Sequence, residues 1–205
     1  MEELKPFNVC LLGRTGDGKS SLINAMFGTK FPTDAFNSCT KELYSVSKIG
    51  ESPEGYDFIS VYDTPGIGEF PDNSKYQQYY DYVVSKTDVI VLVLTLDKRD
   101  APKQRLLLDL VEKLNLEKNI KFIVALNHID SMQVAINKDY QPWNYEENKP
   151  TEECAKIVEE RIQIIKEKYD EILKTDAIVP TCAAEGVNYG IEELKKEILT
   201  LKTIK

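Results

Sequence analysis

The chain has 205 residues, of which 42% are hydrophobic and 29% are charged, and its formal net charge is −8. This composition is typical of a globular protein with one substantial core, so we expect residues 1–205 to form a single domain. The sequence has no run of about 18 apolar residues, and no membrane span is predicted. The acidic balance argues against a general DNA- or RNA-binding surface.

The cysteines are scattered along the sequence and form no C-x-x-C pair. They are Cys10, Cys39, Cys154 and Cys182. This spacing favours free thiols in a reducing compartment over a disulfide framework or a zinc site. The amino-terminal letters M-E-E-L-K-P also lack the apolar segment of a secretory signal. Both features predict a cytoplasmic protein.

The first predicted elements are a short buried strand at 7–12 and a helix at 20–27. Between them, residues 13–20 read G-R-T-G-D-G-K-S, which matches the phosphate-binding pattern G-x-x-x-x-G-K-[ST]. Its glycines let backbone N–H groups surround an anion, its lysine reaches the outer phosphates, and its serine hydroxyl can ligate magnesium. The helix N terminus adds a favourable dipole. The predicted nucleotide contacts of this stretch are Gly13, Arg14, Thr15, Gly16, Asp17, Gly18, Lys19, Ser20 and Ser21.

The rest of the chain alternates between strand and helix patterns, which predicts a mostly parallel sheet with helices on both faces. Ligands bind at the carboxyl ends of the strands in such sheets, so the loops that follow strands are expected to meet at one rim. The predicted strands are 42–49, 56–62, 88–96, 120–126 and 177–180, the first two forming an antiparallel hairpin. The predicted helices are 73–86, 102–116, 151–174 and 190–203.

One of these loops begins with D-T-P-G directly after a predicted strand. Asp63 in this position can hold magnesium through its water shell. Gly66 can offer its backbone N–H to a terminal phosphate because it has no side chain to prevent a close approach. The same letters fit an ordinary turn, and the phosphate-binding pattern earlier in the chain is what favours the magnesium interpretation.

Two later loops predict a base site. In N-H-I-D (127–130), Asn127 offers an amide, and the Asp130 carboxylate can accept hydrogen bonds from the ring N–H and exocyclic amine of guanine. Adenine has the opposite donor pattern at that edge. In isolation, a helix-capping turn at the end of the strand is the favoured interpretation of these residues. In T-C-A-A-E-G (181–186), Cys182 and Ala183 can offer a backbone N–H to the base carbonyl.

Taken in order, G-R-T-G-D-G-K-S, Thr40, D-T-P-G, N-H-I-D and T-C-A resemble the motifs of a translation-factor-class GTPase domain. The stretch T-G-D-G-K-S-S-L-I-N-A-M-F, the C-T-K before the second strand and D-K-R-D after the central strand are similar to the Era-like 50S ribosome-binding GTPases. The resemblance covers essentially the whole chain. It implies GTP or GDP and Mg²⁺ as ligands. It also implies a P-loop three-layer α/β sandwich whose six-stranded, mostly parallel sheet has one antiparallel edge strand.

The resemblance further implies roles for individual residues. The residues expected to ligate magnesium, or to orient its water, are Ser20, Thr40 and Asp63. The residues expected to act in catalysis, by neutralising or sensing the terminal phosphate, are Lys19, Thr40 and Gly66. The expected switch segments, which order around the triphosphate and relax after hydrolysis, are 28–41 and 63–75.

Three residues, one in the base motif and two near the phosphates, depart from the usual pattern of such GTPases. His128 stands where the base motif N-K-x-D has a lysine that packs across the base and bonds to the phosphate loop. An imidazole is expected to reach less far, so affinity is expected to fall while Asp130 preserves selectivity. Ile67 replaces the water-orienting glutamine of Ras-like GTPases, and Gly16 replaces the potassium-binding asparagine of some relatives. Slow intrinsic turnover, or a catalytic group from elsewhere, is expected.

Arg14 and Arg99 are candidate catalytic fingers that would act across a homodimer formed through the nucleotide face, although an ordinary surface arginine is the favoured interpretation of each. Residues 131–150 are longer than a typical connection between a strand and a helix. Within them, a buried Trp143 would staple the helix that Thr151 caps, whereas an exposed one would mark a partner site. We expect the staple.

The leading interpretation is therefore a cytoplasmic GTPase that hydrolyses GTP slowly and works as a magnesium-dependent switch. One alternative is a guanine-nucleotide-binding scaffold without hydrolysis, which Ile67 and His128 suggest. Another is a P-loop kinase for a small molecule, against which D-T-P-G and N-H-I-D argue. The sequence does not identify the effector, whether it is a protein or the ribosome.

Overall fold

The main sheet has six strands in the order β2-β3-β1-β4-β5-β8. The computed structural model describes residues 3–33, 43–66, 81–82, 85–95, 109–112, 120–131, 140–173, 175, 177–184 and 186–201. The strands are β1 (Pro6–Leu12), β2 (Tyr44–Ile49), β3 (Phe58–Asp63), β4 (Val89–Thr95), β5 (Lys121–Asn127) and β8 (Ala177–Pro180). The edge strand β2 runs antiparallel to β3, and the other pairs are parallel. This topology confirms the predicted sheet with one antiparallel edge strand.

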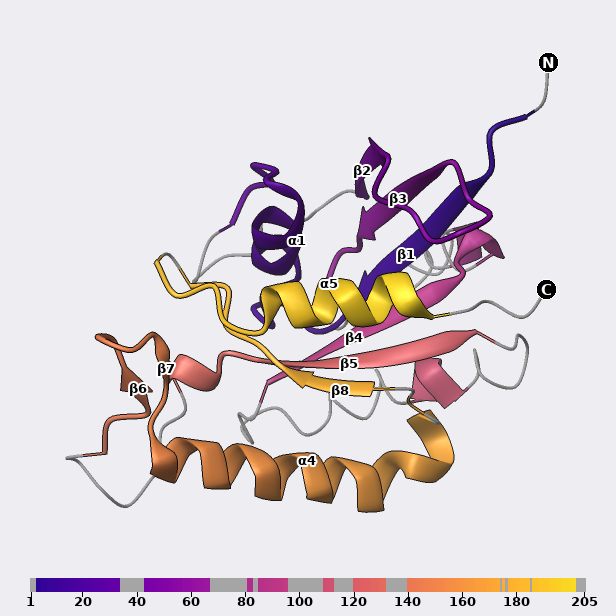
Figure 1. Ribbon diagram of the computed structural model, residues 1–205. Helices are drawn as coiled ribbons and strands as arrows, with labels where there is room; N and C mark the ends of the chain where they lie inside the picture. Colours follow the sequence, from indigo (N-terminus) through magenta and orange to yellow (C-terminus); the bar gives the residue numbers. More distant parts are fainter. Residues whose placement is uncertain are drawn as a thin grey trace.

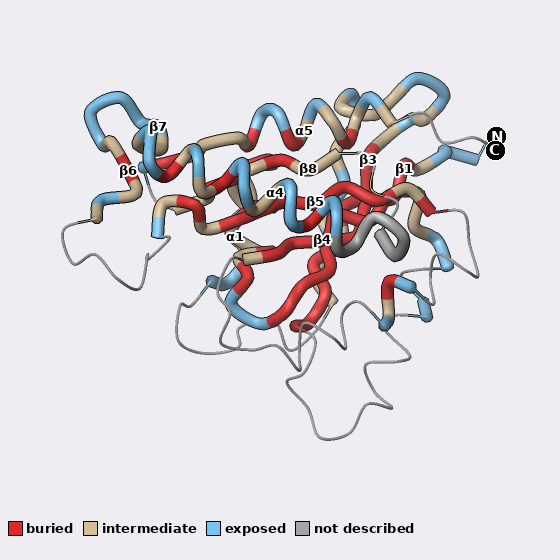
Figure 2. The backbone as a smooth tube through the Cα atoms, turned by 90° about the horizontal axis from the view of Figure 1, so that it is seen from below, coloured by how far each residue is buried: buried red, intermediate tan, exposed pale blue. Residues whose placement is uncertain are grey.

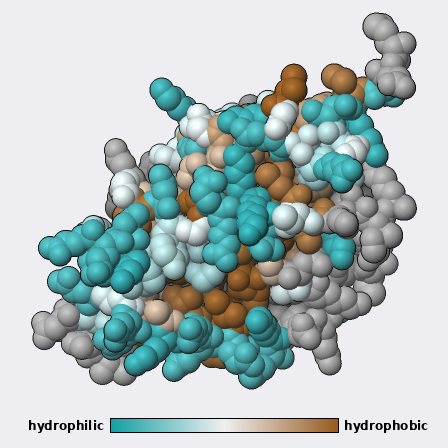
Figure 3. Space-filling model, in the orientation of Figure 1, coloured by the Kyte–Doolittle hydropathy of each residue, from teal (hydrophilic) through white to brown (hydrophobic). Residues whose placement is uncertain are grey.

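Helices cover both faces of the sheet, as predicted (Figure 1). Helices α1 (Lys19–Phe27) and α5 (Ile191–Thr200) lie on one face, and the long α4 (Glu152–Leu173) lies on the other. On the face seen in Figure 3, which has the orientation of Figure 1, hydrophilic side chains cover much of the surface and hydrophobic ones are visible between them. None of the helices within the described residues is long and apolar enough to cross a membrane.

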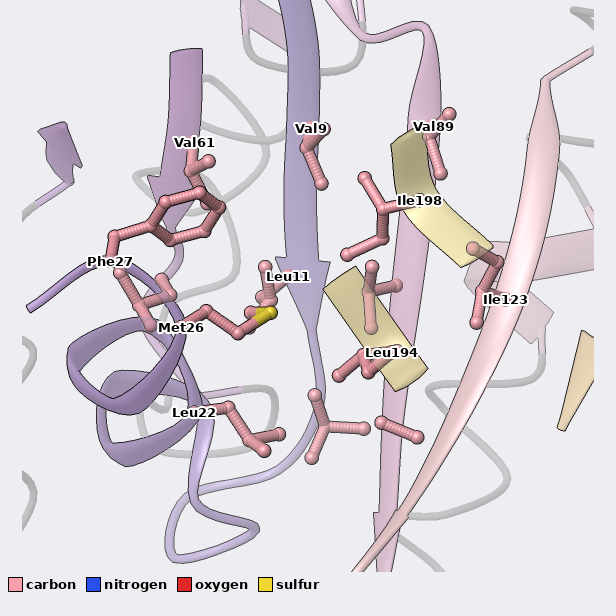
Figure 4. Packing of buried hydrophobic residues seen from close by; sticks show 14 of the residues in the cluster. Val9, Leu11, Leu22, Met26, Phe27, Val61, Val89, Ile123, Leu194 and Ile198 are labelled. Carbon is pink, nitrogen blue, oxygen red and sulfur yellow. The ribbon is translucent and has the colours of Figure 1, made fainter. Parts of the chain in front are cut away.

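The central strands are buried on both faces, which explains their continuous apolar sequence (Figure 2). Successive side chains of β1 point to opposite faces of the sheet. Val9 and Leu11 belong to one buried cluster with Leu22 of α1 and Leu194 of α5 (Figure 4). Leu12 belongs to the cluster on the α4 face. The core therefore fixes the face and register of β1, whose carboxyl end leads into the phosphate-binding pattern.

The ends of several elements differ slightly from the predicted bounds. Asp63 is the last residue of β3 instead of the first residue after it. Within the predicted helices 73–86 and 102–116, residues 81–82, 85–86 and 109–112 are helical, and most of the other residues lie outside the described part of the chain.

A small hairpin formed by β6 (Trp143–Asn144) and β7 (Lys149–Pro150) was not predicted. Trp143 is only 2% exposed, and its ring meets Tyr189 edge-on with the centroids 5.3 Å apart. Next to the hairpin, the Cys154 N–H donates to Thr151 Oγ1 at 3.3 Å, which confirms the predicted cap of α4. The expectation of a buried Trp143 is also confirmed, and its ring packs against the loop after β8.

Candidate functional site

The loop between β1 and α1 forms the floor of the site. Gly16 and Gly18 have φ angles of 80° and 89°, in the left-handed region that favours glycine. A Cβ on Gly18 would lie 3.0 Å from His128 Nε2 and would collide with the Asn127 amide. Among the described residues, no side chain caps the N terminus of α1, and its first turn has no acidic residue. The positive end of the helix dipole is therefore directed at the loop, where it would favour the binding of an anion.

Lys19 and Ser20 project from the first turn of α1 toward this loop. The Lys19 side chain is buried, and its Nζ donates to Gly13 O at 3.1 Å and Arg14 O at 3.0 Å. Ser20 Oγ donates to Asp63 Oδ2 at 2.5 Å. A hydroxyl beside a buried carboxylate is an oxygen donor set of the kind that magnesium prefers. The Ser20 and Asp63 side chains therefore fit the predicted metal site.

The segment after β3 packs directly on the phosphate loop. Thr64 Oγ1 donates to Leu11 O of β1 at 2.7 Å. A Cβ on Gly66 would lie 2.5 Å from the Thr15 backbone nitrogen and 2.7 Å from Thr15 Cα. Such distances are too short for any side chain, so the contact requires glycine. Gly66 thus lies beside the residues predicted to hold the phosphates, as a residue that senses a terminal phosphate must.

Asn127, the last residue of β5, connects three loops. Its Nδ2 donates to Asp17 O in the phosphate loop at 2.9 Å. Its Oδ1 accepts from Thr181 Oγ1, directly after β8, at 3.2 Å. Thr181 is not among the predicted site residues, although its hydroxyl directly follows a predicted strand and could have indicated a role. The amide therefore holds the base-site loops against the phosphate loop.

His128 reaches farther than expected. Its Nε2 lies 3.1 Å from Gly16 O, so the ring bonds to the phosphate loop as the usual lysine was expected to do. The backbone explains this reach, because His128 itself has a left-handed φ of 61°. Gly18 also leaves room beside the ring. The expected shortfall in reach is therefore wrong.

Asp130 lies in the short helix η2 (Ile129–Ser131). Its Oδ1 is buried and has no hydrogen-bond partner among the described residues. A buried carboxylate oxygen without a donor is unfavourable, and a ligand that brings N–H donors would satisfy it. Burial raises the pKa of the nearby Cys182 thiol to about 12, and the Asp130 carboxylate acts in the same direction. This thiol therefore stays protonated near neutral pH.

The backbone of Cys182 is already paired within the protein. The Cys182 N–H donates to Tyr189 O at 3.0 Å, and the Tyr189 N–H donates back to Cys182 O at 2.9 Å. The expected contact from Cys182 to a base carbonyl therefore needs correction, because this bridge uses its N–H. Ala183 is the residue left for that contact. Since Trp143 packs on Tyr189, the hairpin also supports this loop.

The guanidinium of Arg14 is engaged inside the protein. It donates to the Asp17 carboxylate at 3.1 and 3.3 Å, and to Thr95 Oγ1 at 2.7 Å. The residue is 8% exposed. It is therefore neither a surface arginine nor placed as a catalytic finger. Three other residues named in the sequence predictions, Thr40, Ile67 and Arg99, lie outside the described residues. Most of the two predicted switch segments lies outside them as well.

Comparison with known proteins agrees with these motifs. The family model for the 50S ribosome-binding GTPase matches residues 8–128, more than half of the chain. The chain is 32% identical to GTP-binding protein A of Dictyostelium discoideum over an alignment of 132 positions that covers 61% of this chain and 28% of that protein. It is 26% identical to the Fe(2+) transporter FeoB of Campylobacter jejuni over an alignment of 211 positions that covers 97% of this chain and 33% of that protein. The chain thus spans a third or less of these two relatives.

Solved structures of Era have the same fold. One is Era in complex with MgGDPNP and a fragment of 16S ribosomal RNA, with a TM-score of 0.65 and 24% identity over 96% of this chain and 57% of that one. Another is Aquifex aeolicus Era bound to GDP·AlF4⁻, with a TM-score of 0.65 and 22% identity over 98% of this chain and 59% of that one. At these identities the likeness shows the fold alone.

Proposed function

Because this chain belongs to the 50S ribosome-binding GTPase family, we propose that it binds GTP and hydrolyses it to GDP and phosphate as a magnesium-dependent switch. One observation carries the proposal. Four loops at the carboxyl ends of β1, β3, β5 and β8 are bonded to one another through Ser20–Asp63, Asn127–Asp17, His128–Gly16 and Thr181–Asn127. This rim is where parallel sheets bind nucleotides.

The chemistry at the phosphates is electrostatic in this proposal. Lys19 and the amides at the start of α1 offset the negative charge of the outer phosphates. Magnesium would be held by Ser20 and Asp63, with Thr40 as a further ligand from outside the described residues. Bound there, the metal supplies additional positive charge at the terminal phosphates. Gly66 presents its backbone to the same region.

The base is selected in this proposal by Asp130, whose buried oxygen accepts from the N–H groups of guanine. The Ala183 N–H is assigned to the base carbonyl. We also place the protein in the cytoplasm, in keeping with the free thiols of Cys10, Cys154 and Cys182. A homodimer through the nucleotide face stays a prediction. Turnover per molecule that rises with protein concentration would support it.

The proposal is tested by titrating the purified protein with GTP, GDP and ATP and by following phosphate release with magnesium or with EDTA. We expect GTP and GDP to bind at least about a hundredfold more tightly than ATP, because a buried carboxylate left without donors rejects the wrong base. Phosphate release should be slow and should stop in EDTA. Tight GTP binding without release of phosphate would favour the alternative of a non-hydrolysing scaffold. Preferential binding of ATP would favour the alternative of a small-molecule kinase.

Replacing His128 with alanine should weaken GDP binding several-fold. The substitution removes the bond to Gly16 O, and a single hydrogen bond contributes about 0.5–1.5 kcal/mol. His128→Lys should retain most of the affinity, because its ammonium can donate to the same carbonyl. Equilibrium titrations with GDP compare the three proteins. Equal affinity in His128→Ala and the unmodified protein would show that the contact contributes nothing to binding.

A further inference from the structure

Besides the motif lysine Lys19, two more charged residues of the phosphate loop are buried, which is unusual for charged side chains. Arg14 is 8% exposed and Asp17 is 2% exposed. They occupy positions that the pattern G-x-x-x-x-G-K-[ST] leaves open. Their burial therefore needs an explanation beyond the motif itself.

The Asp17 carboxylate closes the loop on itself. Its Oδ2 accepts from the Arg14 backbone N–H at 2.8 Å and from Arg14 Nε at 3.3 Å. Its Oδ1 accepts from Arg14 Nη2 at 3.1 Å. The carboxylate thus holds both the main chain and the side chain of a residue three positions earlier. The guanidinium in turn neutralises a carboxylate that would otherwise repel bound phosphates.

Thr95, the last residue of β4, completes the network. Its Oγ1 accepts from Arg14 Nη2 at 2.7 Å and donates to Asp17 Oδ1 at 3.2 Å. The network therefore ties the phosphate loop to the end of β4, while the Asp17 main chain is bonded to Asn127 at the end of β5. The network also bears on Lys19, because Lys19 Nζ donates to Arg14 O.

We propose that Asp17 is a positioning residue that, together with Arg14 and Thr95, sets the shape of the phosphate loop before a nucleotide binds. The inference rests on the proposed function, since it concerns how the same site holds phosphate. A loop already held in its binding shape loses less conformational freedom on binding, and the gain appears as affinity. Without the carboxylate, the buried guanidinium of Arg14 would lack its counterion and the loop would lose its internal restraint.

The test measures GDP affinity in Asp17→Ala, Asp17→Asn and Thr95→Val, with the folded fraction of each checked by circular dichroism at the assay temperature. We expect the GDP dissociation constant to rise about tenfold or more in Asp17→Ala and about threefold in Thr95→Val. Asp17→Asn should lie between Asp17→Ala and the unmodified protein, because it keeps an acceptor for the Arg14 N–H.

Ser52→Ala is the matched control. It removes the hydrogen bond from Ser52 Oγ to Tyr56 O in the turn between β2 and β3, away from the phosphate loop, and should lower the thermal midpoint without changing GDP affinity. A merely structural Asp17 would behave in the same way, so unchanged GDP affinity in folded Asp17→Ala overturns the inference. If Asp17→Ala does not fold, Thr95→Val carries the test, and unchanged affinity there overturns it equally.

The inference and the proposed function fail in different ways. If the unmodified protein binds neither GTP nor GDP, the proposed function itself is overturned, and with it the premise of the inference. If Lys19→Ala weakens GDP binding and folded Asp17→Ala does not, the proposed function stands and the role of Asp17 is overturned.

Discussion

Replacing Lys19 with alanine is expected to lower GTP hydrolysis by at least about a thousandfold and GTP affinity by about a hundredfold. The reason lies in how the loop distributes its charge. The guanidinium of Arg14 is committed to Asp17 and Thr95, so Lys19 must supply the positive charge that the outer phosphates meet. Its ammonium is buried and lies against Gly13 O and Arg14 O, directly over the loop.

Phosphate release and equilibrium GTP titrations measure the two effects of Lys19→Ala. Lys149→Ala is the matched control, because this lysine is exposed and pairs with Glu147 at 2.9 Å on the β6–β7 hairpin. Lys149→Ala should hydrolyse GTP at the same rate as the unmodified protein. Hydrolysis that persists in folded Lys19→Ala would place the reaction at a different site from the one proposed.

The Asp130→Asn variant should lose GTP affinity by about a hundredfold or more and should gain affinity for xanthosine triphosphate. The carboxylate accepts from two N–H groups of guanine in the proposal, and two charge-assisted hydrogen bonds contribute about 3–6 kcal/mol together. Xanthine has a carbonyl where guanine has its amine. An asparagine amide can accept from the ring N–H and donate to that carbonyl, so the substitution restores complementarity with the altered base.

Competition between the two triphosphates on Asp130→Asn and on the unmodified protein measures this exchange of preference. Asp57→Asn is a suitable control, because its exposed carboxylate accepts from Lys5 N just before β3, at the opposite end of the sheet from the proposed site. It should leave the preference for GTP unchanged. A folded Asp130→Asn that still prefers GTP would falsify the assignment of Asp130 to the base.

Most of the sheet could be predicted because its signals are local. The apolar runs of β4 and β5 are as long as buried parallel strands require, and the breakers between the runs separate the elements clearly. The β6–β7 hairpin was missed because each of its strands has only two residues, too few to show a period. Trp143 packs against Tyr189, which is far from it in sequence, and no local pattern predicts this contact.

The same distinction applies to the candidate site, where some roles follow from local motifs and others depend on contacts made only in the folded chain. The roles expected for Lys19, Ser20 and Asp63 follow from motifs in which spacing alone places a donor or an acceptor. The reach of His128 depended on the left-handed backbone of His128 and on the space beside Gly18, which only the folded chain reveals. Likewise, the Cys182 N–H is not available for a base carbonyl because it is bonded to Tyr189 O. This contact between two parts of the loop could not be predicted from local sequence.

By itself, the sequence predicted a nucleotide ligand and the rim of the sheet where it is expected to bind, because the phosphate-binding pattern and strand periodicity act over short spans. The tertiary structure decided what the variable positions of the loop do. Arg14 is an internal partner of Asp17 and Thr95, although the sequence allowed a finger or a surface residue. Thr95 is far from the loop in sequence and reaches it only because β1 and β4 are neighbours in the sheet.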